Sequence, residues 1–332
     1  MPSLPSSRGE ISEALLAALA RPPHALAPIE VPDMEDPLAD EDLQLSLYLC
    51  YELHYRGLPG VDERWEWEPA LLELRRRLEA PFEAALPAPA DESPAQDMDI
   101  ALRELAEDDS GPSISQRLER HAGVEQMLEF MVHRSAYQLK EADPHSWALP
   151  RLSGPPKAAL VEIQADEYGG GRPERVHAQM FADSMEAVGL DSTYGAYLDH
   201  IPGVTLATVN LMSLFGLHRR LRGAVVGHLA LFEMSSSIPN RRYAGGLRRL
   251  GFGEKATAFF DEHVLADAVH EQVAAVDLAG GLARQEPALA AQIVWGASCL
   301  ALLDARWAVH VDRCWDAGES SLRVPLEVLE PA

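Results

Sequence analysis

The sequence predicts an all-α protein. Beyond about residue 115 the chain reads as helical segments almost throughout, separated by short turn signals rich in Gly and Pro. We find no run with the alternation of apolar and polar residues that marks strands, and no internal repeat. The predicted architecture is a helical bundle with a buried centre, preceded by a helical N-terminal extension.

Composition narrows the classes of protein that the chain can belong to. With 332 residues, 47% of them hydrophobic, it can bury a sizeable core. A formal net charge of −24 repels phosphate backbones, which argues against nucleic-acid binding. The apolar runs fall short of the ~18 residues of a membrane span, and the first residues do not form a signal peptide. Three widely spaced cysteines fit a reducing compartment. We therefore expect a cytoplasmic protein without a nucleic-acid or membrane partner.

The first third of the chain predicts short helices between linkers. Residues 1–38 are rich in Pro, Ala and Ser and predict a mostly irregular segment. A helical extension follows at 39–112, in which Asp40 or Asp42 caps the first helix. The expected helices lie at 11–19, 40–54, 69–82 and 98–107.

The bundle itself is expected at 113–320, with a tail at 321–332. Turn signals such as Ile238-Pro239-Asn240 divide it into helices. The expected helices lie at 115–141, 155–168, 174–188, 203–234, 241–250, 253–275 and 284–315.

The segment 259–270 carries the strongest chemical signal. It contains neither Pro nor Gly, so a helix is the natural interpretation. At about 100° per residue, His263, Asp267 and His270 fall within an arc of roughly 60° on one helical face. The residues between them are apolar, and burying three ionisable groups without a partner is costly. Metal coordination removes that cost; the alternative is that these are hydrogen-bonded core residues.

A second group of candidate ligands lies upstream. Glu174 and His177 form a Glu-x-x-His pair, whose spacing places both side chains on one helix face. A continuous helix would bring Glu167 to the same side, although Gly169–Gly171 predicts a kink or bulge there. Glu141 ends an earlier helix, where a surface carboxylate is the alternative interpretation.

Together these residues suit a dinuclear site. Three imidazoles and four carboxylates suit two iron or manganese ions better than one zinc ion. Seven donors supply two ions and still leave positions for dioxygen. The candidate metal ligands are Glu141, Glu167, Glu174, His177, His263, Asp267 and His270.

The spacing of these residues resembles the ligand pattern of the heme-oxygenase-like di-iron oxidases, also called iron-containing redox enzymes. The similarity runs from about residue 40 to 315. It implies a bundle of about seven core helices and two irons per chain, cycling between Fe(II) and Fe(III) with O₂ as co-substrate. It further implies three sets of ligands: Glu141, His177 and His270 on one iron; Glu174, His263 and Asp267 on the other; and Glu167 as the bridge.

The resemblance also implies an activity. It is that of a non-heme di-iron, O₂-dependent oxidoreductase that oxidises a small amine- or carboxylate-bearing metabolite in specialised metabolism. The N-terminal extension favours N-oxygenation; desaturation and oxidative C–C cleavage are alternatives within the family. An external electron donor and a homodimer are expected.

Three other classes of protein are alternatives. The first is an iron-binding or storage protein without oxidase activity. A true heme oxygenase would leave the carboxylates unexplained. A thiamin hydrolase of the same fold would need an activated cysteine, and no cysteine here has an obvious activating neighbour.

Three residues are candidates for a catalytic role: Glu167, Tyr168 and Glu233. Glu233 lies on an apolar helix and is interpreted as a pocket wall, an additional ligand or a helix cap. Tyr168, with Asp166, is among the nearest candidates for orienting a ligating histidine.

Overall fold

The chain is helical in all the parts that the structure describes. The computed structural model describes residues 4–89, 97–107 and 111–326, without the side chains of 265–269. These residues form helices and no strand, and one isolated bridge joins Tyr168 to Val176. The predicted all-α class is therefore confirmed, and the fold is heme-oxygenase-like.

The α-helices follow one another with short connections, several of them 3₁₀ turns. Asp40 caps α2 as expected, because its carboxylate accepts from the Leu43 N–H at 2.8 Å. The helices are α1 Glu10–Leu19, α2 Glu41–Glu52, α3 Pro69–Ala84, α4 Met98–Ala106, α5 Ile114–Arg120, α6 Val124–Gln138, α7 Asp143–Ser146, α8 Gly154–Glu167, α9 His177–Ala187, α10 Gly203–Leu217, α11 Arg222–Arg249, α12 Glu254–Gln272, α13 Gly280–Gln285 and α14 Ala290–Asp316.

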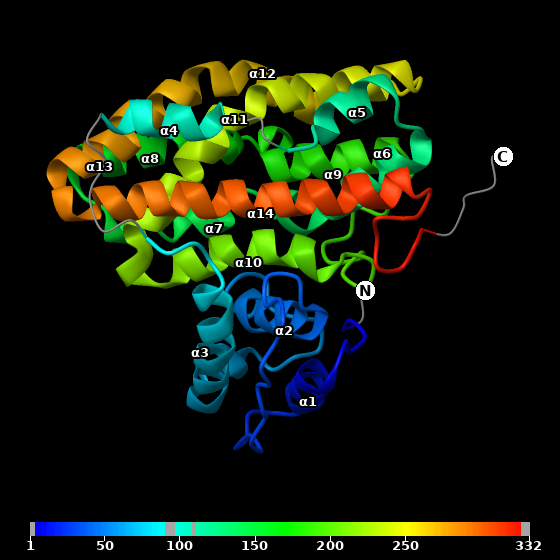
Figure 1. Ribbon diagram of the computed structural model, residues 1–332, viewed down its shortest axis with the longest axis vertical. Helices are drawn as coiled ribbons and strands as arrows, with labels where there is room; N and C mark the ends of the chain where they lie inside the picture. Colours follow the sequence, from blue (N-terminus) through cyan, green and yellow to red (C-terminus); the bar gives the residue numbers. More distant parts are fainter. Residues whose placement is uncertain (1–3, 90–96, 108–110, 327–332) are drawn as a thin grey trace.

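The N-terminal helices form a layer of their own. In Figure 1, α1, α2 and α3 lie together on one side of the bundle, next to α10. α2 packs directly on α10, and both α1 and α3 pack on α2. On the other side of α10, the long helix α11 packs against both α12 and α14, and α9 packs against α12. The domain boundaries expected from the sequence stay a prediction.

The expected helices differ from the structure at three places. The helix expected at 203–234 ends at Leu217 as α10, because the chain passes through a 3₁₀ turn at Arg219–Leu221 before α11 begins. The turn expected at Pro239 does not form, because Pro239 lies inside the continuous helix α11. A proline removes one backbone hydrogen bond, but the buried face of the helix continues past it with Tyr243, Ala244 and Leu247. Conversely, the helix expected at 115–141 is two helices, α5 and α6, because the chain turns through His121–Gly123.

Two glycines permit the close crossing of α11 and α14. A Cβ on Gly227 would lie far inside contact distance of the Ile293 carbonyl oxygen, and one on Gly296 would meet the Ala224 backbone. The backbones touch here, so neither position has room for a side chain.

Gly227→Ala is therefore expected to destabilise the protein, by about 1–3 kcal/mol or more. Gly245→Ala is the matched control on the same helix, since the nearest atom to its added Cβ would be 3.6 Å away. It should be neutral or stabilising by about 0.5–1 kcal/mol. Urea unfolding of both variants measures the difference in stability. Equal stabilities would contradict the close backbone contact between α11 and α14 at Gly227.

His133 joins three parts of the bundle as a buried neutral imidazole. Its Nδ1 lies 2.8 Å from Thr205 Oγ1 on α10, and its Nε2 lies 3.0 Å from Ser321 Oγ, beyond α14. Burial, with smaller effects of the His310 and Arg134 charges, lowers the pKa of His133 to about 3. The unfolded chain therefore binds a proton below about pH 6.5 that the folded protein does not bind.

The stability of the fold should consequently fall as the pH falls. For His133 alone the loss between about pH 7 and about pH 5 is about 2 kcal/mol. We expect the difference in unfolding free energy between wild type and His133→Gln to shrink by this amount over that interval. Urea unfolding at both pH values is the measurement. A pH-independent difference would mean that folding does not shift the pKa of His133.

One helical stretch has the length and composition of a membrane span. Residues Pro287–Asp316 are long and apolar enough to cross a membrane, and 50% of their most apolar 18-residue stretch is buried inside the protein. A core helix passes the same test, so this stretch is weak evidence for a span. The expected absence of a membrane partner stays a prediction.

Candidate metal centre

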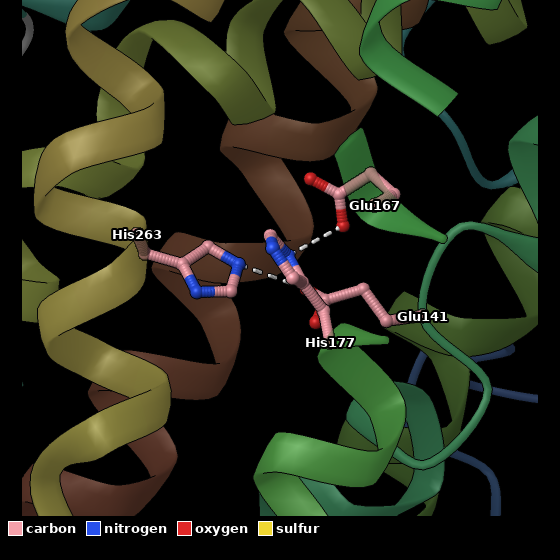
Figure 2. A group of neighbouring side chains, drawn as sticks. All are labelled: Glu141, Glu167, His177 and His263. Atoms are coloured by element: carbon pink, nitrogen blue, oxygen red, sulfur yellow. Dashed lines mark ion pairs between the residues drawn. The ribbon is translucent and has the colours of Figure 1, made fainter. Parts of the chain in front are cut away.

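Four buried ligand-type side chains meet in the middle of the bundle. Glu141, Glu167, His177 and His263 each offer one ligand atom, and these four atoms lie within 4.8 Å of one another. In Figure 2, His263 approaches from α12, and the other three approach from the opposite side. Two imidazoles and two carboxylates from distant segments of the chain thus converge, and all four side chains are buried.

A tight turn brings Glu167 and His177 together. α8 ends at Glu167, and the three residues Gly169–Gly171 all have positive φ, at 68°, 59° and 78°. A Cβ on Gly169 would lie 2.7 Å from the Val176 nitrogen, so only glycine allows the chain to fold back here. As a result, His177 Nδ1 lies 2.9 Å from Glu167 Oε2.

The same turn removes Glu174 from the group. The helix expected at 174–188 begins only at His177, because the glycines and Pro173 hold the preceding residues in 3₁₀ turns. Glu174 lies in one of these turns with its side chain exposed, and the two groups of candidate ligands do not include it. The Glu-x-x-His pair therefore does not share one helix face in this structure.

Glu141 is held by an unusual backbone. It follows the end of α6, and the next residue, Ala142, has a φ of 73°, which is strained for a residue with a side chain. The Gln164 amide fixes this turn by donating to the Ala142 carbonyl at 2.9 Å. The Gln138 amide donates to Glu141 Oε1 at 3.4 Å. Neither glutamine was identified from the sequence, since a buried amide has no distinctive spacing.

His263 is set in the tautomer that a metal requires. Its Nδ1 lies 2.9 Å from the Phe259 carbonyl oxygen one turn earlier. A carbonyl only accepts, so Nδ1 carries the proton and Nε2 presents its lone pair. Nε2 lies 3.6 Å from Glu141 Oε1, on the side of the group. Such an orienting bond is typical of ligating histidines.

A second group shares Glu167 with the first. Glu167, Glu233 and His270 are all buried, and each offers an atom within 4.8 Å of the others. His270 Nδ1 lies 3.3 Å from Glu233 Oε2 and 4.0 Å from Glu167 Oε1. Glu167 therefore turns Oε2 toward His177 and Oε1 toward His270. Each oxygen of Glu167 thus faces one of the two groups, and the bridging role expected for Glu167 stays a prediction.

The outer nitrogen of His270 faces another carboxylate. Nε2 lies 3.1 Å from Asp166 Oδ2, and Asp166 directly precedes the shared Glu167. Burial lowers the pKa of His270, but Glu233, Asp166 and Glu167 together raise it to about 9. The Glu167 pKa is lowered, because its contacts with His177, His263 and His270 outweigh burial. The buried carboxylates thus favour positive charge beside them. Bound metal ions would supply such charge.

The residues present fit a resident metal. Within the part of the chain that the structure describes, three buried atoms of the first group have no hydrogen-bond partner: Glu141 Oε2, Glu167 Oε2 and His177 Nδ1. Glu167 Oε2 and His177 Nδ1 are close to each other, yet their geometry is not that of a hydrogen bond. Buried polar atoms without partners are costly, and a cation among them removes the cost. Carboxylates with imidazoles suit iron or manganese.

The structure groups the predicted ligands differently from the resemblance. His177 lies with His263, their ring centroids 4.5 Å apart, whereas His270 lies with Glu233. The Asp267 side chain lies outside the described residues. The assignments of Asp267 and Glu174 as ligands stay predictions.

The two other candidates for catalysis take different positions. Glu233 lies beside Glu167 and His270 and also lines a small second pocket, so its role as an additional ligand or a pocket wall stays a prediction. Tyr168 contacts neither group through its hydroxyl, which donates to Asp143 at 2.9 Å and lies 2.8 Å from the Ser146 hydroxyl. It thereby ties the glycine turn to α7. Its predicted catalytic role stays a prediction.

A cavity of about 340 Å³ adjoins the first group, a volume typical of small-molecule sites. Glu141 and His263 form part of its wall, together with aromatic and aliphatic side chains from α6, α11, α12 and α14. A small molecule in this cavity would therefore meet the candidate ligands directly.

Comparison with known proteins places these observations in a family. The family described as "iron-containing redox enzyme" matches residues 128–305, more than half of the chain. The chain is also 31% identical, over 137 residues, to a nitrosourea synthase of Streptomyces achromogenes subsp. streptozoticus. That similarity covers 41% of this chain and only 29% of the relative.

Proposed function

The chain belongs to the family of iron-containing redox enzymes, and on that premise we propose that it is a non-heme di-iron oxidoreductase that uses O₂. We propose further that it oxidises a small amine- or carboxylate-bearing metabolite, with N-oxygenation as the favoured reaction. Iron and redox chemistry come with the family; the number of ions, the use of O₂ and the substrate are our proposal.

The shared position of Glu167 carries the proposal of two ions. One group holds Glu141, His177 and His263 beside Glu167, and the other holds Glu233 and His270 beside it. A single ion would leave one of these groups of buried ionisable side chains without a cation. Two ferrous ions at these positions would supply electrons for the reduction of O₂.

The surrounding residues have roles of their own in this proposal. The carboxylates of Glu141, Glu167 and Glu233 hold negative charge that favours the ferric state. The Phe259 carbonyl keeps His263 in the ligating tautomer. The cavity admits substrate on the side of Glu141 and His263, and its apolar wall excludes water from that side. The cavity also favours an enzyme over an iron store, which needs no substrate site.

The name of the relative favours oxidation at nitrogen. A nitrosourea contains a nitrogen–nitrogen bond to a nitroso group, so the synthesis of one requires an oxidised nitrogen. Because the similarity covers only part of each chain, this supports the reaction class rather than a substrate. Desaturation and C–C cleavage are the alternatives, and product analysis by mass spectrometry distinguishes an added oxygen from a loss of two hydrogens or a shortened chain.

Anaerobic titration with Fe(II), followed by mixing with O₂, tests the proposal. We expect two Fe(II) per chain by equilibrium dialysis and consumption of O₂ by the loaded protein. One iron or none per chain, or no O₂ consumption, would overturn it. Our proposal includes a homodimer, a cytoplasmic location and an external electron donor. Gel filtration tests the dimer, and multiple turnovers that depend on an added reductase test the donor.

A further inference from the structure

We propose that Tyr137 is a redox-active residue: when O₂ is reduced at the candidate metal centre and no substrate is bound, its phenol supplies one electron and one proton. This inference rests on the proposed function, because the oxidant is O₂ reacting with the iron-loaded protein. It concerns a side chain that belongs to neither group of candidate ligands.

Tyr137 shares a small pocket with both groups of candidate ligands. It is buried, with 6% of its surface exposed, and it lies in the last turn of α6, four residues before Glu141. The pocket has a volume of about 10 Å³, close to that of one water probe. Its wall contains Tyr137 together with Glu141, Glu167, Glu233 and His263. Among the described residues, Tyr137 is the only tyrosine in this wall.

Carboxylates dominate the surroundings of the Tyr137 hydroxyl. Burial raises the pKa of Tyr137 well above its ordinary value. The charges of Glu141, Glu167 and Glu233 raise it further. The Ala142 backbone N–H opposes this effect by donating a hydrogen bond to the phenol oxygen. An oxygen that accepts from the backbone keeps its own O–H for an acceptor, and the charged acceptors in the pocket wall are carboxylates.

Oxidation of this phenol therefore requires that its proton leaves with the electron. Because the pKa of Tyr137 is raised, the phenolate is not populated, and an electron cannot be taken from it. Loss of an electron from the intact phenol produces a strongly acidic cation, which gives its proton to a base within hydrogen-bond reach. The carboxylates in the pocket wall are such bases.

The electrons and protons of this step balance. Reduction of one O₂ to two waters takes four electrons and four protons. Two electrons come from two Fe(II), which become Fe(III), one comes from Tyr137, and one comes from the external donor. Breakage of the Tyr137 O–H bond supplies one proton through a carboxylate, and solvent supplies three. The product on the protein is a neutral tyrosyl radical.

Neighbouring rings separate the phenol from solvent. Tyr137 makes edge contacts with Phe232, at 5.6 Å between ring centroids, and with His145, at 6.3 Å. Burial lowers the pKa of His145 to about 4, so its ring is neutral beside Tyr137. Neither a phenyl ring nor a neutral imidazole gives up an electron as readily as a phenol, so the radical stays on Tyr137.

Two other tyrosines near the centre have different surroundings. Tyr243 lines the larger cavity, but its hydroxyl is hydrogen-bonded to the Arg134 guanidinium, which is not a proton acceptor. The Tyr168 hydroxyl donates to Asp143, which belongs to neither group of candidate ligands. Tyr243 is buried like Tyr137 and is therefore the matched control.

Electron paramagnetic resonance after rapid freezing tests the inference. The full-length protein is loaded with Fe(II) anaerobically, with a small excess of Fe(II) as electron donor, and is mixed with O₂ without substrate. We expect a transient organic radical, whose spectrum narrows when the protein contains ring-deuterated tyrosine. Tyr137→Phe should lose the radical, and Tyr243→Phe should keep it.

Iron content and circular dichroism of both variants separate loss of the radical from loss of the centre. Tyr137→Phe protein that binds the wild-type amount of iron and forms no radical supports the inference. If Tyr137→Phe does not load iron, the wild-type protein with ring-deuterated tyrosine decides, together with Tyr243→Phe and Tyr168→Phe. The radical must then be a tyrosyl radical that survives both substitutions.

Three results would overturn the inference: no radical in wild type although O₂ is consumed, a radical that ring deuteration does not change, or a radical that persists in iron-loaded Tyr137→Phe. A phenol that only donates a hydrogen bond to a carboxylate would give the first of these results. O₂ consumption without a radical would contradict only this inference. A protein that neither binds two irons nor consumes O₂ would contradict the proposed function, and this inference with it.

Discussion

Glu167→Gln is expected to abolish O₂ consumption and to reduce bound iron from two ions per chain to at most one. Glu167 is the one residue shared by both groups of candidate ligands, with Oε2 toward His177 and Oε1 toward His270. Glutamine has the same shape but no charge, and its amide nitrogen cannot ligate. Since loss of residues that merely orient a ligand costs 10- to 100-fold in metal affinity, we expect more than about 100-fold here.

The measurement is iron per chain after anaerobic dialysis, together with O₂ uptake. Glu162→Gln is the matched control, because Glu162 lies on the same helix α8 with its side chain exposed. It should keep both irons and the wild-type rate. Unchanged iron content in Glu167→Gln, with helical content intact by circular dichroism, would contradict the bridging position.

The same assay decides the assignment of Glu174. Two irons in Glu174→Gln would mean that this exposed carboxylate is not a ligand, as its place in the 3₁₀ turn indicates. Loss of one iron would mean that the turn at 169–175 rearranges when metal binds. Asp267→Asn tests the remaining predicted ligand in the same way.

Lys140→Met is expected to destabilise the fold by about 3–5 kcal/mol. Lys140 and Glu52 form an ion pair of 2.8 Å that joins the turn after α6 to the N-terminal layer, with side chains only 1% and 2% exposed. The Lys140 ammonium also lies 4.3 Å from the Tyr55 ring centroid. Tyr194 donates a hydrogen bond of 2.7 Å to Glu52. Removing the lysine leaves the Glu52 charge buried without its cation.

Urea unfolding of single and double variants tests the origin of the effect. Lys140→Met with Glu52→Gln should recover most of the lost stability, because it removes the unpaired charge and keeps an acceptor for Tyr194. Lys255→Met is the control, since its ion pair with Glu186 is more than half exposed; its cost should be below about 1 kcal/mol. Equal costs for Lys140→Met and Lys255→Met would show that burial of the pair is unimportant.

Loss of the Lys140–Glu52 ion pair should also affect iron binding. Lys140 directly precedes Glu141, whose position depends on the strained backbone of Ala142. We therefore expect weaker iron binding in Lys140→Met and recovery in the double variant. Iron content measured on the same samples provides this second readout.

Local sequence patterns determined the helices and the types of ligand. Local patterns predict α8 and α12, because a helix is stable where one of its faces can be buried. The spacing of His263 and His270 predicts one face for both, since that geometry is internal to a helix. For the same reason, the choice of iron or manganese over zinc followed from residue types alone. The family resemblance depended on these local features.

Only the tertiary structure decided how these residues combine. Glu233 joins His270 across 37 residues because α11 packs on α12, and no local spacing encodes that contact. The glycine turn after Glu167 places His177 in the group and leaves Glu174 exposed, since three residues with positive φ redirect the chain. Tyr137 meets members of both groups in one pocket for a similar reason. Sequence determines what each helix presents, whereas long-range packing determines which side chains face one another.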